Sequence, residues 1–260
     1  MGKSLKSWKK LLFSLLCLAL LSCAHQESVN RGACGSCDTL HSKEFKPEDA
    51  IKSMVLITGT AIQGEKKLGQ WWGSGAVVGH NEKMGTLILT AGHVCVLSGL
   101  PPPKEGDAPI TWTLDVTDKT ETTYPAIVAF VVKDFDACLI NVSLMDVPHL
   151  NLSESPPVVG ERVSNISAPF AVFSKDLSLI FEGRYAGDLD IRKDLKVSAY
   201  TIPGAGGASG SPVLNAQGDI VGIVSQVNGY FHHITLSPMH EQLKVLFSGK
   251  AKVLHFDFAN

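Results

Sequence analysis

The chain has 260 residues, of which 45% are hydrophobic and 18% are charged, with 24 glycines and 13 prolines. This composition is typical of a globular protein and excludes a chain that is disordered throughout. Its formal net charge is only −2, and its length accommodates one large all-β unit or two domains of ordinary size.

The first 22 residues have the pattern of a secretory signal peptide. Four lysines in MGKSLKSWKK precede the apolar run LLFSLLCLALL, which is too short to span a bilayer as a mature anchor. Without residues 1–22 the chain has 19 Lys and Arg against 25 Asp and Glu, a net charge of −6. A mildly acidic protein without a basic cluster is a poor candidate for binding nucleic acid.

The end of this segment, LLSC, resembles the lipobox of bacterial lipoproteins, in which a peptidase cuts before a cysteine that becomes lipid-modified. The resemblance implies that Cys23 is the mature N-terminus. The protein would then be exported and held at the membrane of the bacterial cell envelope by its lipid. An ordinary cleaved signal, which would leave a secreted protein, is the alternative.

Residues 23–46 are polar and lack apolar periodicity, so we expect a flexible tether between the lipid anchor and the fold. They contain the sequence CGSC. A redox C-x-x-C motif stands near a βαβ unit, and zinc needs a closed shell of four ligands, for which His25 and His41 are weak support. We therefore favour a local disulfide between Cys34 and Cys37, with no metal and no cofactor. A tethered thiol or metal-binding protein is an alternative.

From residue 53 the sequence consists of short runs rich in Val, Ile, Thr and aromatic residues, separated by Gly, Pro, Asn and Asp. Such spacing is typical of a β-sandwich or β-barrel. The linker NLSESPP divides the runs into two sets of six. The predicted fold is all-β, with two six-stranded antiparallel β-barrels. The N-terminal barrel covers residues 47–150, the C-terminal barrel with its helix covers 151–250, and 251–260 form a tail. The predicted strands are 53–62, 71–79, 85–94, 109–117, 124–132, 136–143, 158–167, 177–187, 195–202, 211–215, 219–226 and 230–237.

Near the C-terminus, SPMHEQLKVLFSG predicts a helix. Ser237 would be its N-cap, Pro238 its first residue, and Gly249 would follow its end. An apolar stripe would be formed by Leu243, Leu246 and Phe247.

Three residues have the chemistry of an activated nucleophile. A serine hydroxyl needs an adjacent base that a third group orients. Ser209 lies in the glycine-rich GGASGSPVLN, His93 ends an apolar strand, and Asp136 begins another. The order His, Asp, Ser differs from that of α/β-hydrolases. Ser211 replaces the second glycine of a G-x-S-x-G elbow, and the hairpin pattern that follows argues against a phosphate loop. A structural serine in a turn is the alternative.

The blocks TAGH, DACLI and GASGSP resemble the catalytic blocks of chymotrypsin-like serine proteases, most closely the bacterial branch with periplasmic quality-control proteases and glutamyl endopeptidases. GSGAVV and GDIVGIVS match neighbouring strands of that branch, so the resemblance covers roughly residues 50–247. It implies that Ser209 is the nucleophile, His93 the general base and then acid, and Asp136 the group that fixes the imidazole tautomer. The backbone N–H groups of Gly207 and Ser209 would form the oxyanion hole.

The resemblance also implies a serine endopeptidase that acts on a protein or peptide through an acyl-enzyme intermediate. A catalytically silent homologue that binds peptides in the cell envelope is the alternative. Ala208 stands where trypsin-like enzymes have an aspartate that pairs with a newly cut N-terminus. We therefore predict that no such activation step exists. Cys95 and Cys138 each follow a triad residue by two positions, so a disulfide between them is expected if the triad forms, and two buried free thiols are the alternative.

By the same analogy, the backbone of residues 224–226 would pair with substrate as an added strand. Segment 203–205 and the YFHHI strand would line the primary pocket, where a histidine would favour an acidic substrate residue. The substrate-binding residues expected in this way are Pro203, Val224, Ser225, Gln226, His232 and His233.

Overall fold

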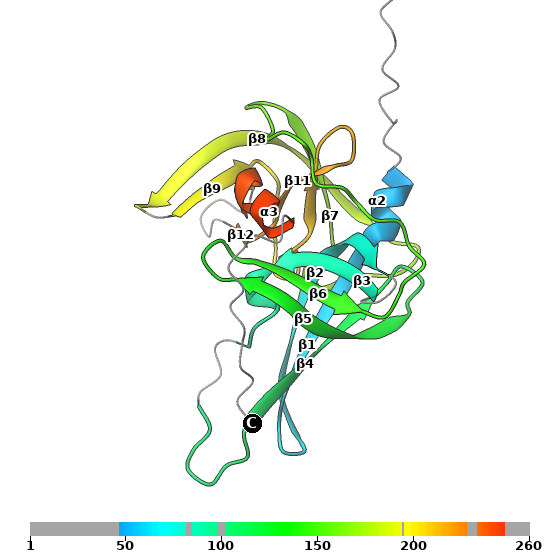
Figure 1. Cartoon of the computed structure of the whole chain (residues 1–260), viewed down its shortest axis with the longest axis vertical. Coiled ribbons are helices and arrows are strands. Elements are labelled where there is room, and N and C mark those ends of the chain that lie inside the picture. The colour runs from blue at the N-terminus through cyan, green and yellow to red at the C-terminus, as the bar shows by residue number, and fades with distance from the viewer. Residues whose placement is uncertain (1–46, 82–84, 98–101, 194, 228–232, 248–260) are drawn as a thin grey trace, which may run out of the picture. The chain divides into compact units, whose positions relative to one another are not determined.

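The computed structural model describes residues 47–81, 85–97, 102–193, 195–227 and 233–247 (Figure 1). All of them belong to one compact unit of the chain. The predicted signal peptide, the expected lipidation site at Cys23, the expected tether with Cys34 and Cys37, and the predicted C-terminal tail lie outside the described residues. Within these ranges, no helix has the length and apolarity that crossing a membrane requires.

The first half is a closed antiparallel barrel with strand order β1-β2-β3-β6-β5-β4. The predicted six-stranded barrel is therefore confirmed. Alternate side chains of its strands point inward, as the pleat of a β-strand requires, and form a buried apolar interior. The elements are α2 (Pro47–Ser53), β1 (Met54–Gln63), β2 (Lys66–Asn81), β3 (Gly85–Ala91), the 3₁₀ turn η1 (Gly92–Val94), β4 (Ile110–Thr117), β5 (Thr123–Val132) and β6 (Ala137–Val142).

The short helix α2 was not predicted from the sequence. It begins with Pro47 and has Glu48 and Asp49 in its first turn. A proline at the first helical position and acidic residues beside the positive end of the helix dipole both favour a helix start. These signals were present in the sequence, and the strand expected from residue 53 begins one residue later, at Met54.

The second half is a seven-stranded sheet with order β11-β10-β7-β8-β9-β13-β12. Its edge strands β11 and β12 are separated in the chain only by Val224 and Ser225, so the sheet curls enough to bring the end of β11 next to the start of β12, in keeping with the expected second barrel. The elements are β7 (Arg162–Ser167), the 3₁₀ turn η2 (Pro169–Ala171), β8 (Leu179–Arg192), β9 (Leu195–Tyr200), β10 (Pro212–Leu214), β11 (Ile220–Ile223), β12 (Gln226–Val227), β13 (Thr235–Pro238) and the helix α3 (His240–Phe247).

The seventh strand arises because the single run predicted over 219–226 divides into β11 and β12. The Val224 N–H donates to the Ser211 carbonyl at 2.9 Å, whereas the Ser225 N–H donates to the Leu236 carbonyl at 2.9 Å. Consecutive residues are thus hydrogen-bonded to segments near opposite ends of the sheet, Ser211 beside β10 and Leu236 in β13, and the chain passes from one end of the sheet to the other between them.

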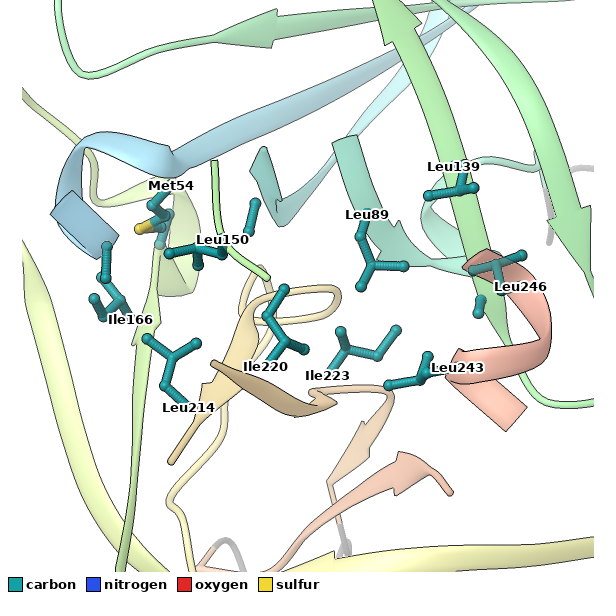
Figure 2. Packing of buried hydrophobic residues seen from close by; sticks show 14 residues of the cluster. Met54, Leu89, Leu139, Leu150, Ile166, Leu214, Ile220, Ile223, Leu243 and Leu246 are labelled. Carbon is teal, nitrogen blue, oxygen red and sulfur yellow. The ribbon is translucent and has the colours of Figure 1, made fainter. Parts of the chain in front are cut away.

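The two halves share an apolar core (Figure 2). Met54, Leu89 and Leu139 come from the first barrel, while Ile166, Leu214, Ile220 and Ile223 come from the second half, and Leu243 and Leu246 from α3. Burial of one such side chain contributes about 1.5–3 kcal/mol. This shared core fixes the two halves together, so segments from opposite halves keep a constant position beside one another.

Helix α3 begins later than predicted. The Ser237 hydroxyl accepts a hydrogen bond from the Ile223 N–H at 2.9 Å, and Ser237 lies in β13 rather than at the helix start. The Gln242 side chain instead accepts from the Met239 N–H at 2.7 Å at the start of the helix. The predicted apolar stripe is confirmed: Leu243 and Leu246 are buried and Phe247 packs against the shared core.

Candidate active site

His93 and Asp136 are held together by three hydrogen-bond contacts at one end of the first barrel. Strand β3 ends at Ala91, and the turn η1 presents His93, whose backbone N–H donates to Asp136 Oδ1 at 2.7 Å. The imidazole Nδ1 lies 2.9 Å from Oδ2 and 3.1 Å from Oδ1 of the same carboxylate. A Cβ at Gly92 would lie 3.0 Å from Asp136 Oδ1, so glycine allows this close approach. The contacts fix the ring and leave its Nε2 without a hydrogen bond among the described residues.

Asp136 is suited to remain a carboxylate at neutral pH. Burial alone would raise its pKa, but hydrogen bonding and charge attraction from His93 and a hydrogen bond from the Ser225 hydroxyl together hold the pKa below its ordinary value. The Ser225 hydroxyl donates to Oδ2 in a short hydrogen bond. An ionised carboxylate at this position stabilises a protonated imidazole and selects the tautomer in which Nδ1 carries a proton.

Ser225 was expected to contact substrate through its backbone, and its side-chain contact with Asp136 was not anticipated. No local pattern marks this role, because Ser225 is 89 residues from Asp136 and the second half of the protein has to fold against the first to bring them together.

Ser209 lies in a tight loop between β9 and β10, next to the first barrel. Its carbonyl accepts a hydrogen bond from the Ser74 N–H of β2 at 2.7 Å. Gly210, with φ of +87°, lies so close to β3 that a Cβ would be 2.0 Å from Thr90 Oγ1. Gly207 has φ of +91°, and a Cβ there would be 2.8 Å from the Ala168 carbonyl oxygen. The glycines that flank Ser209 are thus required by backbone conformation and by lack of space.

The loop orients two backbone amides beside Ser209. The Gly206 carbonyl accepts from the Phe170 N–H at 2.6 Å, and the Ala208 carbonyl accepts from the Ser211 N–H at 3.1 Å. In a planar trans peptide the C=O and the following N–H point in opposite directions. The N–H groups that follow these two carbonyls are those of Gly207 and Ser209, and neither has a hydrogen-bond partner among the described residues. They are available to a developing oxyanion.

In the part of the chain that the structure describes, no hydrogen bond joins the Ser209 hydroxyl to the His93 imidazole. Catalytic hydrogen bonds of this kind are often long in the free enzyme and tighten only when substrate is bound. The three expected triad residues therefore come from the two halves of the protein, with His93 and Asp136 directly bonded and Ser209 tied to the strand β2 that precedes them.

The expected substrate-binding residues lie in several environments. Val224 is bonded within the protein through both backbone groups, because its carbonyl also accepts from the Gly210 N–H at 2.6 Å. Gln226 is exposed on the edge strand β12, which among the described residues pairs with β13 alone. Pro203 is half-buried and His233 is an exposed turn residue, whereas His232 lies outside the described residues.

The expected disulfide between Cys95 and Cys138 is present. Both residues are fully buried in the first barrel, and each lies two positions after a residue of the His–Asp pair. Among the described residues, no three His, Cys, Asp or Glu side chains are grouped as metal ligands.

Two cavities differ in their relation to this site. One of about 100 Å³ is lined by Phe135, Asp136, Ser225, Gln226 and Leu236, among others, and so adjoins the His–Asp pair. The other, of about 710 Å³, follows the linker around residues 151–158 and the β10–β11 turn, and no triad residue lines it.

Comparison with known proteins places the chain in a family. The family model described as "Trypsin-like peptidase domain" matches residues 73–223, which include His93, Asp136 and Ser209. No curated protein matches. Two solved structures resemble the chain: a serine endoprotease from Yersinia pestis (16% identity, TM-score 0.57, covering 78% of this chain and 64% of that one) and the HtrA-type protease AlgW with a tripeptide (17%, 0.59, 77% and 61%).

At these identities the two structures support the fold, and the chain spans a little over three-fifths of their length. The family model, by contrast, covers more than half of the 260 residues. It also spans strands of both halves and every residue of the His, Asp and Ser constellation. The protein therefore belongs to the trypsin-like peptidase domain family of serine proteases.

Proposed function

We propose that the protein is an endopeptidase that hydrolyses peptide bonds with Ser209 as nucleophile, His93 as general base and acid, and Asp136 as the orienting carboxylate. The observation that carries this proposal is the bonded His93–Asp136 pair, whose Nδ1–Oδ2 distance is 2.9 Å. It lies beside a serine loop with two amides that have no hydrogen-bond partner among the described residues. An ionised acid, an oriented base and oxyanion donors are the parts that acyl transfer to a serine needs.

In the first step the Ser209 oxygen attacks the carbonyl carbon of the substrate, and its proton passes to His93 Nε2. The resulting imidazolium is stabilised by Asp136, and the tetrahedral oxyanion accepts hydrogen bonds from the N–H groups of Gly207 and Ser209. His93 then donates its proton to the leaving amine, and an acyl-enzyme ester forms on Ser209. Water, deprotonated by His93, attacks the ester, and the proton returns to Ser209 as the acid product leaves.

The test is labelling by a fluorophosphonate, which reacts with activated serines. The full chain, produced in an oxidising compartment and purified in mild detergent, is expected to be labelled at Ser209 as located by peptide mass spectrometry. Labelling should be lost in Ser209→Ala and His93→Ala and retained in His149→Ala. His149 is exposed and its ring contacts His80, which pairs with Thr86 at the end of β3 opposite to His93. A folded protein without label would refute the proposal and favour a catalytically silent peptide-binding homologue.

We also propose that the protein is exported and anchored by lipid on Cys23. The support is the sequence LLSC after a basic and apolar segment, and the Cys95–Cys138 disulfide, which suits an oxidising compartment. Growth of a bacterial host with an alkyne fatty acid should label the protein, and Cys23→Ala should remove the label. Equal labelling of both proteins would contradict the anchor.

A further inference from the structure

Lys119 is a buried lysine outside the triad. It lies in the turn that joins β4 to β5 and is only 8% exposed. Its Nζ donates to the Ser174 carbonyl at 2.7 Å and to the Leu177 carbonyl at 2.6 Å, and lies 4.5 Å from the centroid of the Phe173 ring. Removing an ammonium group from water is costly, so such a group is buried only where strong partners hold it. Lys119 of the first barrel therefore holds residues 173–177 of the second half in place through these contacts.

The turn that carries Lys119 is itself rigid. The buried Asp118 carboxylate accepts hydrogen bonds from the Thr120 N–H at 2.8 Å and the Thr122 N–H at 3.0 Å. From the same turn, Glu121 Oε1 accepts from the Lys175 N–H at 3.3 Å. The loop 173–177 is thus fastened to a preorganised turn at two points, one of them the Lys119 ammonium.

The fastened loop continues directly from η2, whose backbone is unusual. Phe170 and Ala171 have φ of +54° and +57°, a left-handed conformation that is unfavourable for residues other than glycine. The Phe170 side chain is 75% exposed, so its own packing does not stabilise this backbone. Such a conformation persists only where the surrounding structure holds it. Within η2 the Val172 N–H donates to the Pro169 carbonyl at 2.9 Å, and Phe173 packs against the shared core. The contacts that join the following residues to the β4–β5 turn are those of Lys119 and Glu121.

The strained residue is the one that orients the oxyanion hole. The Phe170 N–H donates to the Gly206 carbonyl at 2.6 Å, and the peptide that carries this carbonyl also carries the Gly207 N–H. Rotation of this peptide would replace a hydrogen-bond donor with a carbonyl oxygen at the oxyanion position. The hydrogen bond from Phe170 therefore opposes that rotation.

We infer that Lys119 is a positioning residue for the oxyanion hole: by holding the loop 173–177 it keeps Phe170 in place to orient the peptide between Gly206 and Gly207. This inference rests on the proposed peptidase function and deepens it. Lys119 does not touch substrate. Its removal leaves the His93–Asp136 pair and the edge strand β12 intact, so the loss falls on transition-state stabilisation rather than on binding of substrate.

The experiment compares Lys119→Met, which keeps an unbranched side chain without donors, with Lys66→Met, which removes an exposed lysine in the β1–β2 hairpin. Steady-state cleavage of a peptide substrate is measured well below the unfolding midpoint of each variant. Loss of one oxyanion donor costs about 10²–10³ in kcat. Partial loss of its orientation in Lys119→Met is expected to lower kcat by about tenfold or more with KM within about twofold, whereas Lys66→Met should match the wild type.

Two further readouts separate positioning from general damage. The rate of fluorophosphonate labelling at Ser209 should fall by the same factor as kcat. Peptide affinity is measured in the Ser209→Ala variant, which does not cleave the peptide, and it should be the same whether or not Lys119→Met is also present. An unchanged kcat in folded Lys119→Met, or a rise in KM alone, would overturn the inference. If Lys119→Met does not fold, Lys119→Gln, with two neutral donors, is expected to show the same split, and an unchanged kcat there would equally overturn it.

Failure of this inference is distinguishable from failure of the proposed function. A wild-type protein that is not labelled at Ser209 refutes the peptidase itself. A wild-type protein that is labelled, together with Lys119→Met labelled at the same rate, refutes only the role of Lys119.

Discussion

Reduction of the Cys95–Cys138 disulfide should strongly destabilise the protein. The two cysteines are 43 residues apart in the chain, and the cross-link restricts the unfolded chain far more than the folded one. The loop-closure relation gives about 4 kcal/mol for a loop of this length at 25 °C. Since domains are stable by only about 5–15 kcal/mol, this is a large share of the total. With a typical urea m-value of about 2 kcal/mol/M, the midpoint should fall by roughly 2 M.

The assay is urea unfolding followed by tryptophan fluorescence, for the oxidised protein and for the same protein kept reduced. This comparison leaves every side chain unchanged except for the cross-link. Cys95→Ala/Cys138→Ala is the control, because the reductant should not shift its midpoint. Equal urea midpoints for oxidised and reduced wild type would refute the reasoning. If the reductant lowered the midpoint of the double variant by the same amount, the reasoning would also be refuted, because the effect would then come from other cysteines.

Three further predictions concern the site. Ser225→Ala removes a hydrogen bond to the Asp136 carboxylate; such bonds contribute about 1.5–3 kcal/mol, so kcat should fall roughly tenfold to a hundredfold, and unchanged turnover would contradict the role. In Gly207→Ala the new Cβ would lie 2.8 Å from the Ala168 carbonyl oxygen, on a backbone with φ of +91°. This variant should lower kcat by about 10² or more. Gly206→Ala is the control: its Cβ position has open space around it, so this variant should remain active. Because the pKa of Asp136 is lowered in the folded protein, its contribution to stability is complete above its unfolded value of about 3.9 and is lost as pH falls through the folded pKa. Urea midpoints measured from pH 7 to pH 3 should therefore decrease more in wild type than in Asp136→Asn, and parallel decreases would contradict this.

Features that depend on local pattern could be predicted from the sequence. Runs rich in Val, Ile, Thr and aromatic residues located the strands of the first barrel, and the positions of Cys95 and Cys138 after the His and Asp blocks indicated their pairing. The Cys95–Cys138 pair is confirmed, and the catalytic roles of the triad stay predictions.

Other features depend on contacts between distant residues and left no local signal. The break between β11 and β12 exists because Val224 and Ser225 are hydrogen-bonded to segments near opposite ends of a curled sheet, and the apolar run across them has the pattern of one strand. Ser237 has the local pattern of an N-cap, but its hydroxyl accepts from Ile223 instead. Phe170 has a left-handed backbone without being a glycine, so nothing in the sequence marked η2.

The crossing between β11 and β12 also has a mechanical consequence. Ser225, whose hydroxyl donates to the Asp136 carboxylate, is followed immediately by the two residues of the edge strand β12. A peptide that adds to this edge would therefore pull on a backbone only one residue away from the Asp136 contact. Binding of a peptide at this edge and the orientation of the Asp136 carboxylate would then be coupled. A displacement of β12 would be transmitted to the His93 imidazole through the Ser225–Asp136 and Asp136–His93 hydrogen bonds.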